Sequence, residues 1–429
     1  MKRIENLILG AGISGIACGY ELKKKNLDSL ILEKNQSWGG LLDNFTIEGF
    51  RFDKFVHLSF AKDDYVNKIF RKTPLLEHEP RISNFYNGYW LKHPAQNNLF
   101  PLKQNEKDLI LRDFKNRKNA ELSGIRNYEQ WLRVQFGNYF SENFPMVYTE
   151  KYWTLPAEEL ETKWIGDRLY RPTVKEVEEG CLTNDTPNTY YAKEMRYPKQ
   201  GGYKSFLKPM VDKVSIKTNS EVSSICLDSK TIELTNGNNY IFKNLVSSLP
   251  LPEICKLIKN IPNNVLAASE KLNFTSGYLV SLGFNKENIA KDFWFYIYDK
   301  EILPSRVYSP SLKSPDNVPQ GCSSLQAEIY FNRGIKFDMG DAEILDDTIQ
   351  QFIKMGLFKE EDLVVKDIRS EKYANVIFDH SIYENRKTVL DFLEKKDIIS
   401  IGRFGEWDYF WSDQSMLSGR SGALRLLKT

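Results

Sequence analysis

Apolar residues near the start of the chain form two short runs with a helical pattern between them. Residues 6–9 and 29–32 are apolar runs typical of buried parallel strands, and residues 16–25 carry apolar side chains at helical spacing. Two parallel strands joined by a helix form a βαβ unit. We therefore predict that the chain opens with a Rossmann-like parallel sheet.

A charged, helical pattern follows from residue 106 to about residue 168. Within it, residues 128–136 and 139–148 have apolar and aromatic side chains at the spacing of amphipathic helices. An aromatic stretch at residues 152–156 comes next. This pattern predicts a mainly helical insertion between two parts of a cofactor-binding domain.

Alternating polar and apolar positions then predict antiparallel strands. Residues 213–242 form a β-meander pattern with a turn at Asn236-Gly237, and residues 245–249 form an apolar strand that can rejoin the parallel sheet. Three further segments alternate in the same way and predict a second, antiparallel sheet; they are residues 275–284, 293–298 and 324–331.

The last segment returns to the first pattern, with an apolar strand at residues 398–401 and a helix at residues 413–427. The predicted fold class is therefore α/β: a discontinuous Rossmann-like domain, of the kind that binds a dinucleotide cofactor, with a helical insertion and an antiparallel-sheet substrate domain. The cofactor domain is expected to be built from three segments of the chain, and each of the other two domains from one segment. The expected boundaries are 1–100, 191–250 and 386–429 for the cofactor domain, 101–190 for the helical insertion and 251–385 for the substrate domain.

Charge and composition exclude several kinds of partner. The 429 residues include 59 basic and 57 acidic side chains, so no net field favours nucleic acid. Aromatic residues make up 13% of the chain, which fits either an aromatic core or a deep pocket for a flat ligand. No run reaches the roughly 20 apolar residues of a membrane span. The five cysteines are widely spaced, which argues against a metal site or disulfides and favours a cytoplasmic protein.

The glycine-rich turn after the first strand is the strongest chemical signal. Gly10 permits a tight turn, Gly12 lets the backbone approach a pyrophosphate, and Gly15 lets the helix pack closely on the strand. The start of the helix offers free N–H groups and a partial positive charge to phosphate. Glu33, at the end of the second strand, is placed to bind an adenosine ribose.

The residues after Glu33 favour FAD over NAD. The pair Gly39-Gly40 suits an extended segment that runs beside a long cofactor towards its isoalloxazine ring, and residues 50–57 follow in the order expected for such a segment. An ordinary turn would explain the two glycines alone. The sequence therefore predicts bound FAD.

Several segments together resemble a known family. They are residues 39–41 (Gly-Gly-Leu), 93–98 (His-Pro-Ala-Gln-Asn-Asn), 151–153 (Lys-Tyr-Trp), 164–168 (Trp-Ile-Gly-Asp-Arg), 196–198 (Arg-Tyr-Pro) and 402–409 (Gly-Arg-Phe-Gly-Glu-Trp-Asp-Tyr). Their order is similar to that in flavoproteins of the amine oxidase and protoporphyrinogen oxidase type. The segments at 93–98, 164–168 and 402–409 more specifically resemble UDP-galactopyranose mutases, especially the eukaryotic kind.

The resemblance implies an isomerase of polysaccharide biosynthesis. Such mutases interconvert the pyranose and furanose forms of a nucleotide-linked sugar, with N5 of the reduced flavin attacking the anomeric carbon and the nucleotide diphosphate leaving. The implied partner is thus a nucleotide-diphosphate sugar, and the implied reductant that keeps FAD in its active form is NAD(P)H. The flavin supplies the nucleophile, and the protein supplies orientation and charge.

The resemblance also implies a function for particular residues. Arg168 and Arg306 would stabilise the departing diphosphate, and His57 would lie against the flavin near N5. The implied substrate-binding residues are Gln96, Trp153, Tyr296, Lys313 and Tyr409. The implied cofactor-binding residues are Gly10, Gly12, Ser14, Gly15, Glu33, Lys34, Gly40, Leu41, Val222, Arg403, Gln414, Ser415 and Met416.

This chain departs from the family pattern at four places. His93 stands where the mutases carry a tyrosine, and Lys313 stands where they carry a phosphate-binding tyrosine. Asn375 replaces a late tyrosine, and Phe55-Val56 replaces the Gly-Gly before the histidine. These changes leave diphosphate binding plausible but leave the sugar and the base open.

Two alternatives remain from the sequence. One is a flavin oxidase or dehydrogenase of the protoporphyrinogen oxidase-like class, acting on an amine or a ring. The other is a flavin-binding protein that has lost catalysis and serves as a partner. Two arginines directed at one cleft favour an anionic substrate and argue against a plain amine oxidase. The oligomeric state is not predicted.

Overall fold

The first sheet grows from β1 (Lys2–Leu9), whose last residues are apolar and fully buried. β1 pairs in parallel with β2 (Ser29–Leu32) on one side and with β12 (Asn239–Ser247) on the other. Helix α1 (Ile13–Lys24) connects β1 to β2, as the apolar spacing predicts. The computed structural model describes residues 2–79, 81–117, 124–166, 168–189, 194–332 and 337–427.

The described strands of this sheet follow the order β10-β11-β12-β1-β2-β9, and β18 also pairs with β12. The meander predicted from alternation is present, because β10 (Val222–Cys226), β11 (Thr231–Leu234) and the start of β12 pair antiparallel. The two remaining strands are β9 (Ile216–Lys217) and β18 (Ile398–Ser400). The fold class predicted from the sequence is therefore confirmed: a Rossmann-like sheet assembled from distant segments.

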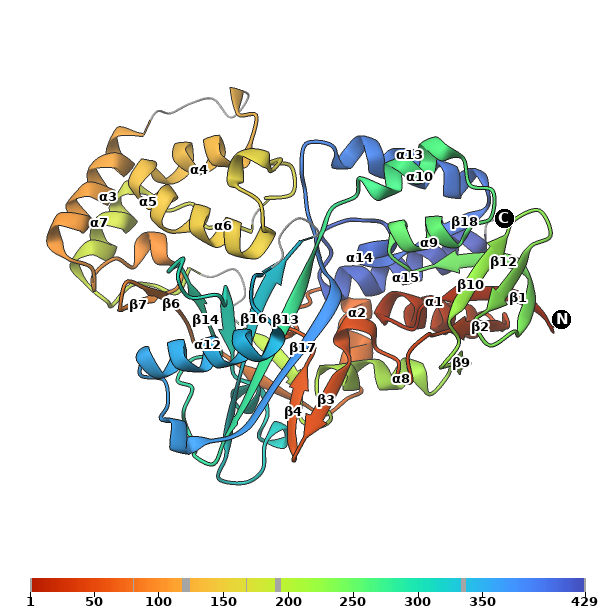
Figure 1. Ribbon diagram of the computed structural model, residues 1–429, viewed down its shortest axis with the longest axis horizontal. Helices are drawn as coiled ribbons and strands as arrows, with labels where there is room; N and C mark the ends of the chain where they lie inside the picture. The colour runs from red at the N-terminus through yellow and green to blue at the C-terminus, as the bar shows by residue number, and fades with distance from the viewer. Residues whose placement is uncertain are drawn as a thin grey trace.

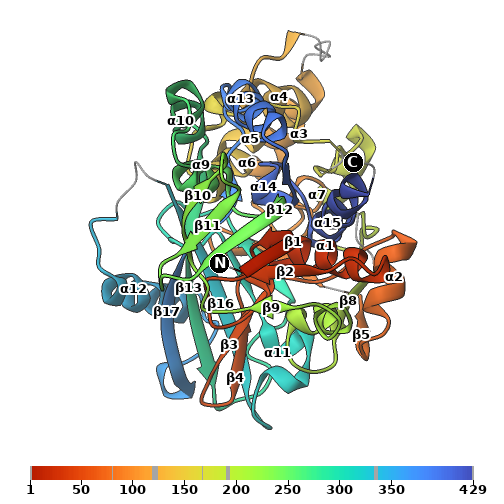
Figure 2. The same cartoon turned by 90° about the vertical axis from the view of Figure 1, so that its right-hand side faces the viewer.

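Helices cover both faces of the first sheet (Figure 2). On one face α1 packs against the last helix, α15 (Ser412–Leu426), with α8 (Lys208–Val211) and α2 (Asp64–Phe70) beside them. Near the other face α9 (Leu251–Leu257) contacts β10. The helices α10 (Asn263–Glu270) and α13 (Ile382–Lys395) contact each other, and α13 also contacts β18.

The second sheet contains a long strand pair and several short strands. Its described strands follow the order β17-β13-β16-β15-β14-β6-β7. The bounds are β6 (Ile82–Tyr86), β7 (Tyr89–Lys92), β13 (Phe274–Phe284), β14 (Trp294–Ile297), β15 (Arg306–Tyr308), β16 (Ser323–Phe331) and β17 (Leu363–Val376). Helix α12 (Asp341–Lys354) contacts β17, and its Ile344 and Phe352 share a buried core with Val280 and Leu282 of β13.

The helical insertion lies above the second sheet, away from both chain termini (Figure 1). It comprises α3 (Gln104–Asn116), α4 (Tyr128–Phe136), α5 (Asn138–Asn143), α6 (Pro145–Trp153) and α7 (Val174–Leu182). The helix expected at residues 139–148 is wrong as a single helix. Pro145 disfavours helical geometry at Phe144, so α5 ends there and α6 begins at the proline.

Short elements connect these parts. A two-stranded ribbon of β3 (Asn44–Ile47) and β4 (Phe50–Asp53) leads out of the first sheet, and β5 (Leu75–His78) pairs antiparallel with β8 (Met195–Pro198). The second ribbon brings together the two ends of the long stretch between residues 78 and 195. The remaining short helices are η1 (Gly40–Leu42), η2 (Ala95–Asn97), η4 (Ala157–Glu159), η5 (Tyr203–Leu207), α11 (Pro310–Lys313), η6 (Pro315–Asn317), η7 (Glu360–Asp362) and α14 (Gly402–Gly405).

Strand pairing places some segments differently from the expected domain boundaries. β6 and β7 belong to the second sheet, although residues 1–100 were expected in the cofactor domain, because β6 pairs in parallel with β14. That pair also makes the second sheet mixed rather than wholly antiparallel. Helices α9 and α10 lie by the first sheet, so the segment expected at 251–385 enters the second sheet only at β13. The expected boundary between residues 190 and 191 lies outside the described residues.

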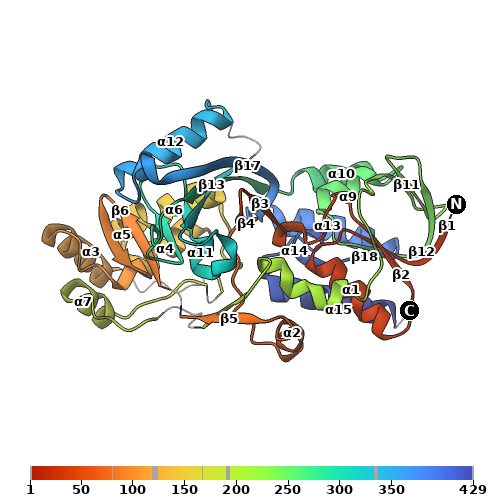
Figure 3. The same ribbon diagram turned by 90° about the horizontal axis from the view of Figure 1, so that it is seen from below.

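The molecule is elongated, with the first sheet at one end and the helical insertion and second sheet at the other (Figure 3). The segments that cross between the two ends come from several parts of the chain. Across the described ranges, no helix is both long enough and apolar enough to cross a bilayer.

Candidate functional site

The glycine turn between β1 and α1 has the geometry that its sequence predicts. Gly10 has a φ of +91°, and its N–H donates to the carbonyl oxygen of Leu32 at 2.8 Å. A Cβ atom on Gly15 would lie 2.0 Å from the Gly10 oxygen, so only glycine allows this approach. A Cβ atom on Gly12 would meet nothing within 4 Å. Gly12 therefore faces an open space at the start of α1, wide enough for a ligand to approach the backbone.

The surroundings of this turn fit a dinucleotide. No side chain caps α1 at Gly12, and its first turn carries no acidic residue, so its N–H groups and positive end face the open space. The buried carboxylate of Glu33 accepts hydrogen bonds from the N–H groups of Ala11 and Asn35, both at 2.9 Å, and from the Asn35 amide. A carboxylate has about four acceptor positions, which leaves one for a ribose hydroxyl.

Other predicted cofactor residues lie around the same turn. The Gly39 N–H donates to Ala11 O at 2.8 Å, and a Cβ on Gly40 would lie 3.3 Å from the Gly12 Cα, so this segment borders the open space. Leu41 continues from it into the wall of the cavity described below. Near Glu33, Val222 begins β10, and the exposed Lys34 follows the carboxylate.

The C-terminal segment approaches the turn from the other side. Ser14 of α1 is buried beneath α15, where a Cβ on Gly419 would lie 2.1 Å from the Ser14 oxygen. Gln414 accepts a hydrogen bond from the Trp411 N–H at 2.8 Å and so caps α15. The start of α15 thus points towards the same region as the start of α1.

Two of the predicted cofactor residues on α15, Ser415 and Met416, are buried in the helix. The Ser415 N–H already donates to the Trp411 oxygen at 2.9 Å. Met416 is fully buried in the core between α1, α15 and the sheet. The apolar side chain of Met416 thus serves packing, and a cofactor contact at this residue stays a prediction.

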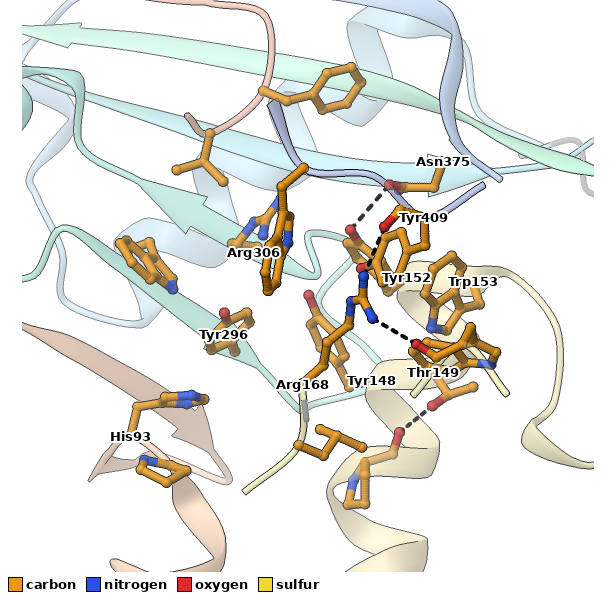
Figure 4. A pocket seen from close by; sticks show the side chains of 18 of the residues that line it. His93, Tyr148, Thr149, Tyr152, Trp153, Arg168, Tyr296, Arg306, Asn375 and Tyr409 are labelled. Atoms are coloured by element: carbon orange, nitrogen blue, oxygen red, sulfur yellow. Dashed lines mark hydrogen bonds between the residues drawn. The ribbon is translucent and has the colours of Figure 1, made fainter. Parts of the chain in front are cut away.

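A cavity of about 390 Å³ opens where the helical insertion, the second sheet and the C-terminal segment meet. Volumes of 300–1,000 Å³ are typical of small-molecule sites. About half of the residues that line it are aromatic: α6 contributes Tyr148, Tyr152 and Trp153, and β14 contributes Trp294 and Tyr296 (Figure 4). Seven of the eight predicted catalytic and substrate-binding residues line this cavity, namely His57, Gln96, Trp153, Arg168, Tyr296, Arg306 and Tyr409.

Arg168 reaches the cavity from the segment that follows the helical insertion's η4. Its guanidinium donates to the backbone oxygens of Trp164 and Tyr409 at 2.9 and 2.8 Å and lies over the Tyr409 ring at 4.4 Å. Within the part of the chain that the structure describes, its Nε has no hydrogen-bond partner and no carboxylate forms an ion pair with it. Arg168 is therefore held in place by two backbone oxygens and the Tyr409 ring, and its positive charge lies in the cavity wall.

Arg306 is held differently. It lies in a row across the second sheet, with Tyr296 of β14 on one side and Glu328 of β16 on the other. Its Nη2 and Nε lie 2.6 and 2.8 Å from the fully buried Glu328 carboxylate. Arg306 thus brings a planar donor to the cavity, while Glu328 offsets much of its charge.

The phenols of the cavity remain protonated near neutral pH. Burial raises the pKa of Tyr296, partly opposed by Arg306, and burial likewise raises the pKa values of Tyr148 and Tyr152. A protonated phenol can donate a hydrogen bond to an anionic oxygen. These tyrosines therefore add neutral donors around the two guanidinium groups.

His57 sits between the cavity and the buried residues behind β4. Burial lowers its pKa to about 4, the charges of Lys313, Arg306 and Arg403 act in the same direction, and Asp53 opposes them. Its ring lies 5.2 Å from that of Tyr203, and its Nδ1 has no hydrogen-bond partner among the described residues. At neutral pH His57 is therefore a neutral imidazole in the cavity wall.

Gln96, Trp153 and His93 shape the insertion side of the cavity. The Gln96 amide donates to the Tyr170 oxygen at 2.9 Å, which leaves its own oxygen as an acceptor. Trp153 is largely buried among the rings of Trp164 and Tyr409, so most of its surface serves packing. Burial lowers the pKa of His93 to about 3, and this side chain therefore adds no positive charge.

Lys313 lies outside the cavity, and its predicted contact with substrate is wrong. Its side chain is buried, and its Nζ lies 2.8 Å from Oδ2 of the equally buried Asp53. The rings of Tyr308 and Tyr197 flank the ammonium at 4.3 and 4.8 Å. The lysine neutralises an internal carboxylate instead of restoring a charge at the substrate.

Phe55 and Val56, the two bulky residues before His57, pack against the second sheet. Phe55 has a φ of +64°, stacks on the Tyr330 ring at 5.9 Å, and fits where Gly277 has no side chain: a Cβ there would lie 2.8 Å from the Phe55 ring. The Val56 N–H donates to Glu328 Oε1 at 2.8 Å. Phe55 and Val56 therefore fix this segment against the second sheet and still line the cavity.

The sequence did not single out Glu328 or Tyr330, and it noted Arg403 and Asn375 without connecting them. Arg403 Nη2 donates to Asn375 Oδ1 at 2.8 Å, and the Tyr152 hydroxyl lies 3.2 Å from the same oxygen. Glu328 was detectable, because it is the one carboxylate within the strand β16, whose residues are nearly all buried. Among the described residues, no group of three His, Cys, Asp or Glu side chains could hold a metal ion.

The glycine turn, with α1 and α15 packed beside it, is typical of a known class of domain. Residues 8–73 match the family model of the NAD(P)-binding Rossmann-like domain. Over the whole chain, the fold is that shared by a nucleotide-sugar mutase and a group of oxidases.

The mutase is a UDP-galactopyranose mutase in its reduced state, similar with a TM-score of 0.93 and 22% identity over 99% of this chain and 96% of that one. A provisionally assigned protoporphyrinogen oxidase of Exiguobacterium is similar with a TM-score of 0.74 and 14% identity over 100% and 99% of the chains. Putrescine oxidase with bound putrescine has a TM-score of 0.67 and 14% identity, again over 100% and 99%. The resemblance read from the sequence is confirmed at the level of the fold.

Proposed function

We propose that this protein is an FAD-dependent mutase that interconverts the pyranose and furanose forms of a nucleotide-diphosphate sugar. The observation that carries the proposal is the convergence of Arg168 and Arg306 on one aromatic cavity that His57 also lines. A nucleotide diphosphate needs cationic donors, and a sugar ring and base need flat apolar walls. Likeness to the mutase over nearly the full chain supports this choice.

FAD fits the glycine turn, with its pyrophosphate at the start of α1 and its ribose at Glu33. When bound and reduced, the flavin supplies the nucleophilic nitrogen that the protein itself lacks. His57 would face the ring as a neutral imidazole, and Arg403, which also lines the cavity, would lie near it.

The chain's own residues would bind and orient the substrate. Arg168, whose charge no carboxylate among the described residues offsets, would hold the diphosphate as its negative charge grows on leaving. Arg306 and the phenol of Tyr296 would donate to the same oxygens from the second sheet. The aromatic wall would exclude water and keep the freed sugar beside the diphosphate.

The test is an activity assay on the purified protein. It should contain FAD, and after reduction by dithionite it should convert UDP-galactofuranose to the pyranose form without consuming reductant stoichiometrically. Arg168→Met should lower the rate at least about 10²-fold, as expected for loss of a donor to developing charge. Glu253→Gln, which changes a surface carboxylate that binds Lys372 and Tyr373, is the control and should leave the rate unchanged.

Other outcomes point elsewhere. Inactivity towards a panel of nucleotide sugars, together with peroxide release on addition of amines, would replace the mutase by an oxidase. A preparation that neither contains nor takes up FAD would end the flavin proposal itself. NAD(P)H would be tested in place of dithionite as the reductant.

A further inference from the structure

Glu328 is a buried carboxylate with no function in the proposed mechanism, and it joins three parts of the cavity wall. Its Oε2 binds the Arg306 guanidinium and accepts from the Tyr330 hydroxyl at 2.7 Å. Its Oε1 accepts from the Val56 N–H at 2.8 Å. One fully buried side chain therefore links β15, β16 and the segment that carries His57.

The two carboxylate oxygens of Glu328 contact groups with different proposed functions. Oε2 contacts the guanidinium that would bind an anion, and Oε1 contacts the backbone one residue before the histidine that would face the flavin. A buried carboxylate is unfavourable when its counter-charge is removed, so the stability of Glu328 in this position depends on Arg306. Phe55 stacks on Tyr330, which Glu328 also binds, so this segment has a second connection to the same carboxylate.

We propose that Glu328 is a positioning residue that couples Arg306 to the Val56–His57 backbone. Binding of an anion to Arg306 would then change the hydrogen bond that holds this backbone, next to the histidine that would face the flavin. This coupling rests on the proposed function in one respect, namely the chemical identity of the anion that Arg306 binds. The linkage from Arg306 through Glu328 to Val56 exists in the protein without ligand.

The first experiment uses the FAD-containing protein without nucleotide and measures hydrogen exchange at the Val56 amide. Glu328→Gln should accelerate exchange about tenfold, because the charged acceptor of the Val56 N–H is lost. Arg306→Met changes a side chain that binds Glu328, and it should also accelerate exchange at the Val56 amide, by about fivefold or more. In the Glu328→Gln background Arg306→Met should add little, since the coupling residue is already gone.

Two controls separate coupling from general loosening. Arg168→Met removes a cavity cation whose hydrogen bonds go to the Trp164 and Tyr409 oxygens, and it should leave Val56 exchange within about twofold of wild type. Glu253→Gln should do the same. Arg306→Lys keeps a positive charge beside Glu328 and should restore part of the protection that Arg306→Met loses. Unchanged exchange in Arg306→Met, or equal acceleration in Arg168→Met, would overturn the proposal.

The second experiment adds UDP as the anion probe. In wild type, UDP should change Val56 exchange by about threefold or more, and in Glu328→Gln UDP should still bind while the change disappears. Binding without any effect on Val56 in wild type would refute the coupling to ligand. Absence of UDP binding would count against the nucleotide-sugar proposal alone, because the ligand-free experiment decides the linkage independently.

Discussion

At the scale of single residues, neighbours decide what a charged side chain can do. Lys313 and Asp53 meet inside the protein, and both are almost fully excluded from solvent. Burial lowers the pKa of Lys313, and the Asp53 charge opposes this shift. Asp53 also accepts from the Tyr197 hydroxyl and the Tyr203 N–H, so the ion pair organises the buried side of His57.

Lys313→Met should therefore act on stability first. It leaves the Asp53 carboxylate buried without its counter-charge, which costs about 3–5 kcal/mol of unfolding free energy in comparable cases. The double variant Asp53→Asn/Lys313→Met removes both charges and should recover more than half of that loss. Urea denaturation of the three proteins measures both effects. A single variant as stable as wild type would show that the pair contributes nothing.

His57 predicts a dependence of stability on pH. Its pKa is about 4 in the folded protein and 6.5 in the unfolded chain. As pH falls from 6.5 to 4, only the unfolded chain takes up this proton, so the contribution of His57 to stability is complete above pH 6.5 and is lost on acidification. His57→Gln should flatten this decline by on the order of 2 kcal/mol, since contact with the cavity reduces the full effect.

Denaturation at pH 7 and pH 4.5, with equal FAD content in both proteins, measures the difference. His93→Gln is the companion variant, because burial also lowers the pKa of His93 and its effect has the same sign. If the two pH curves of wild type and His57→Gln run parallel, His57 is not held neutral by its surroundings.

At the scale of elements, the pairing of α1 with α15 depends on backbone contact. A Cβ on Gly419 would approach the Ser14 oxygen to 2.1 Å and the Ser14 carbonyl carbon to 2.8 Å. Both obstacles are backbone atoms of the helix that begins at the glycine turn, so they cannot move aside without moving the turn.

Gly419→Ala should therefore lower both stability and cofactor content. Overpacking of this kind costs about 1–3 kcal/mol, and displacement of α1 should reduce the FAD absorbance per protein. Leu424→Ala on the same helix is the control, because Leu424 is 38% exposed and its truncation should cost no more than about 0.5 kcal/mol. Thermal melting and the flavin spectrum check both; full FAD content in Gly419→Ala would contradict the packing argument.

Elements with strong local signals could be predicted from the sequence. The βαβ unit, the meander and the long strand β13 have clear periodicity, and their type is confirmed. The division of α5 from α6 was missed because the apolar spacing continues across Pro145. The membership of β6 and β7 in the second sheet was also missed: β7 pairs with β6, but β6 joins the sheet through β14, which lies more than 200 residues later, and no local pattern encodes that pairing.

At the scale of the whole molecule, the cavity is assembled from segments far apart in the sequence. Residue types with a strong chemical preference, such as Arg168 and Arg306, could be placed there by resemblance. The sequence could not show that Glu328 offsets the charge of Arg306, whereas backbone oxygens and aromatic rings hold Arg168. Nor could it show that Lys313 turns inward, since a lysine at a loosely matched position is compatible with either environment.

The β5–β8 ribbon has a consequence for how this protein could change its ligand. It clasps the two ends of the stretch from residue 78 to residue 195, which includes the helical insertion with Tyr148, Trp153 and Arg168. One wall of the cavity thus comes from a single continuous segment of the chain, whereas the glycine turn, Glu33 and α15 lie outside this segment. Exchange of that segment between related chains would change which molecule the cavity accepts and leave the proposed flavin-binding residues unchanged.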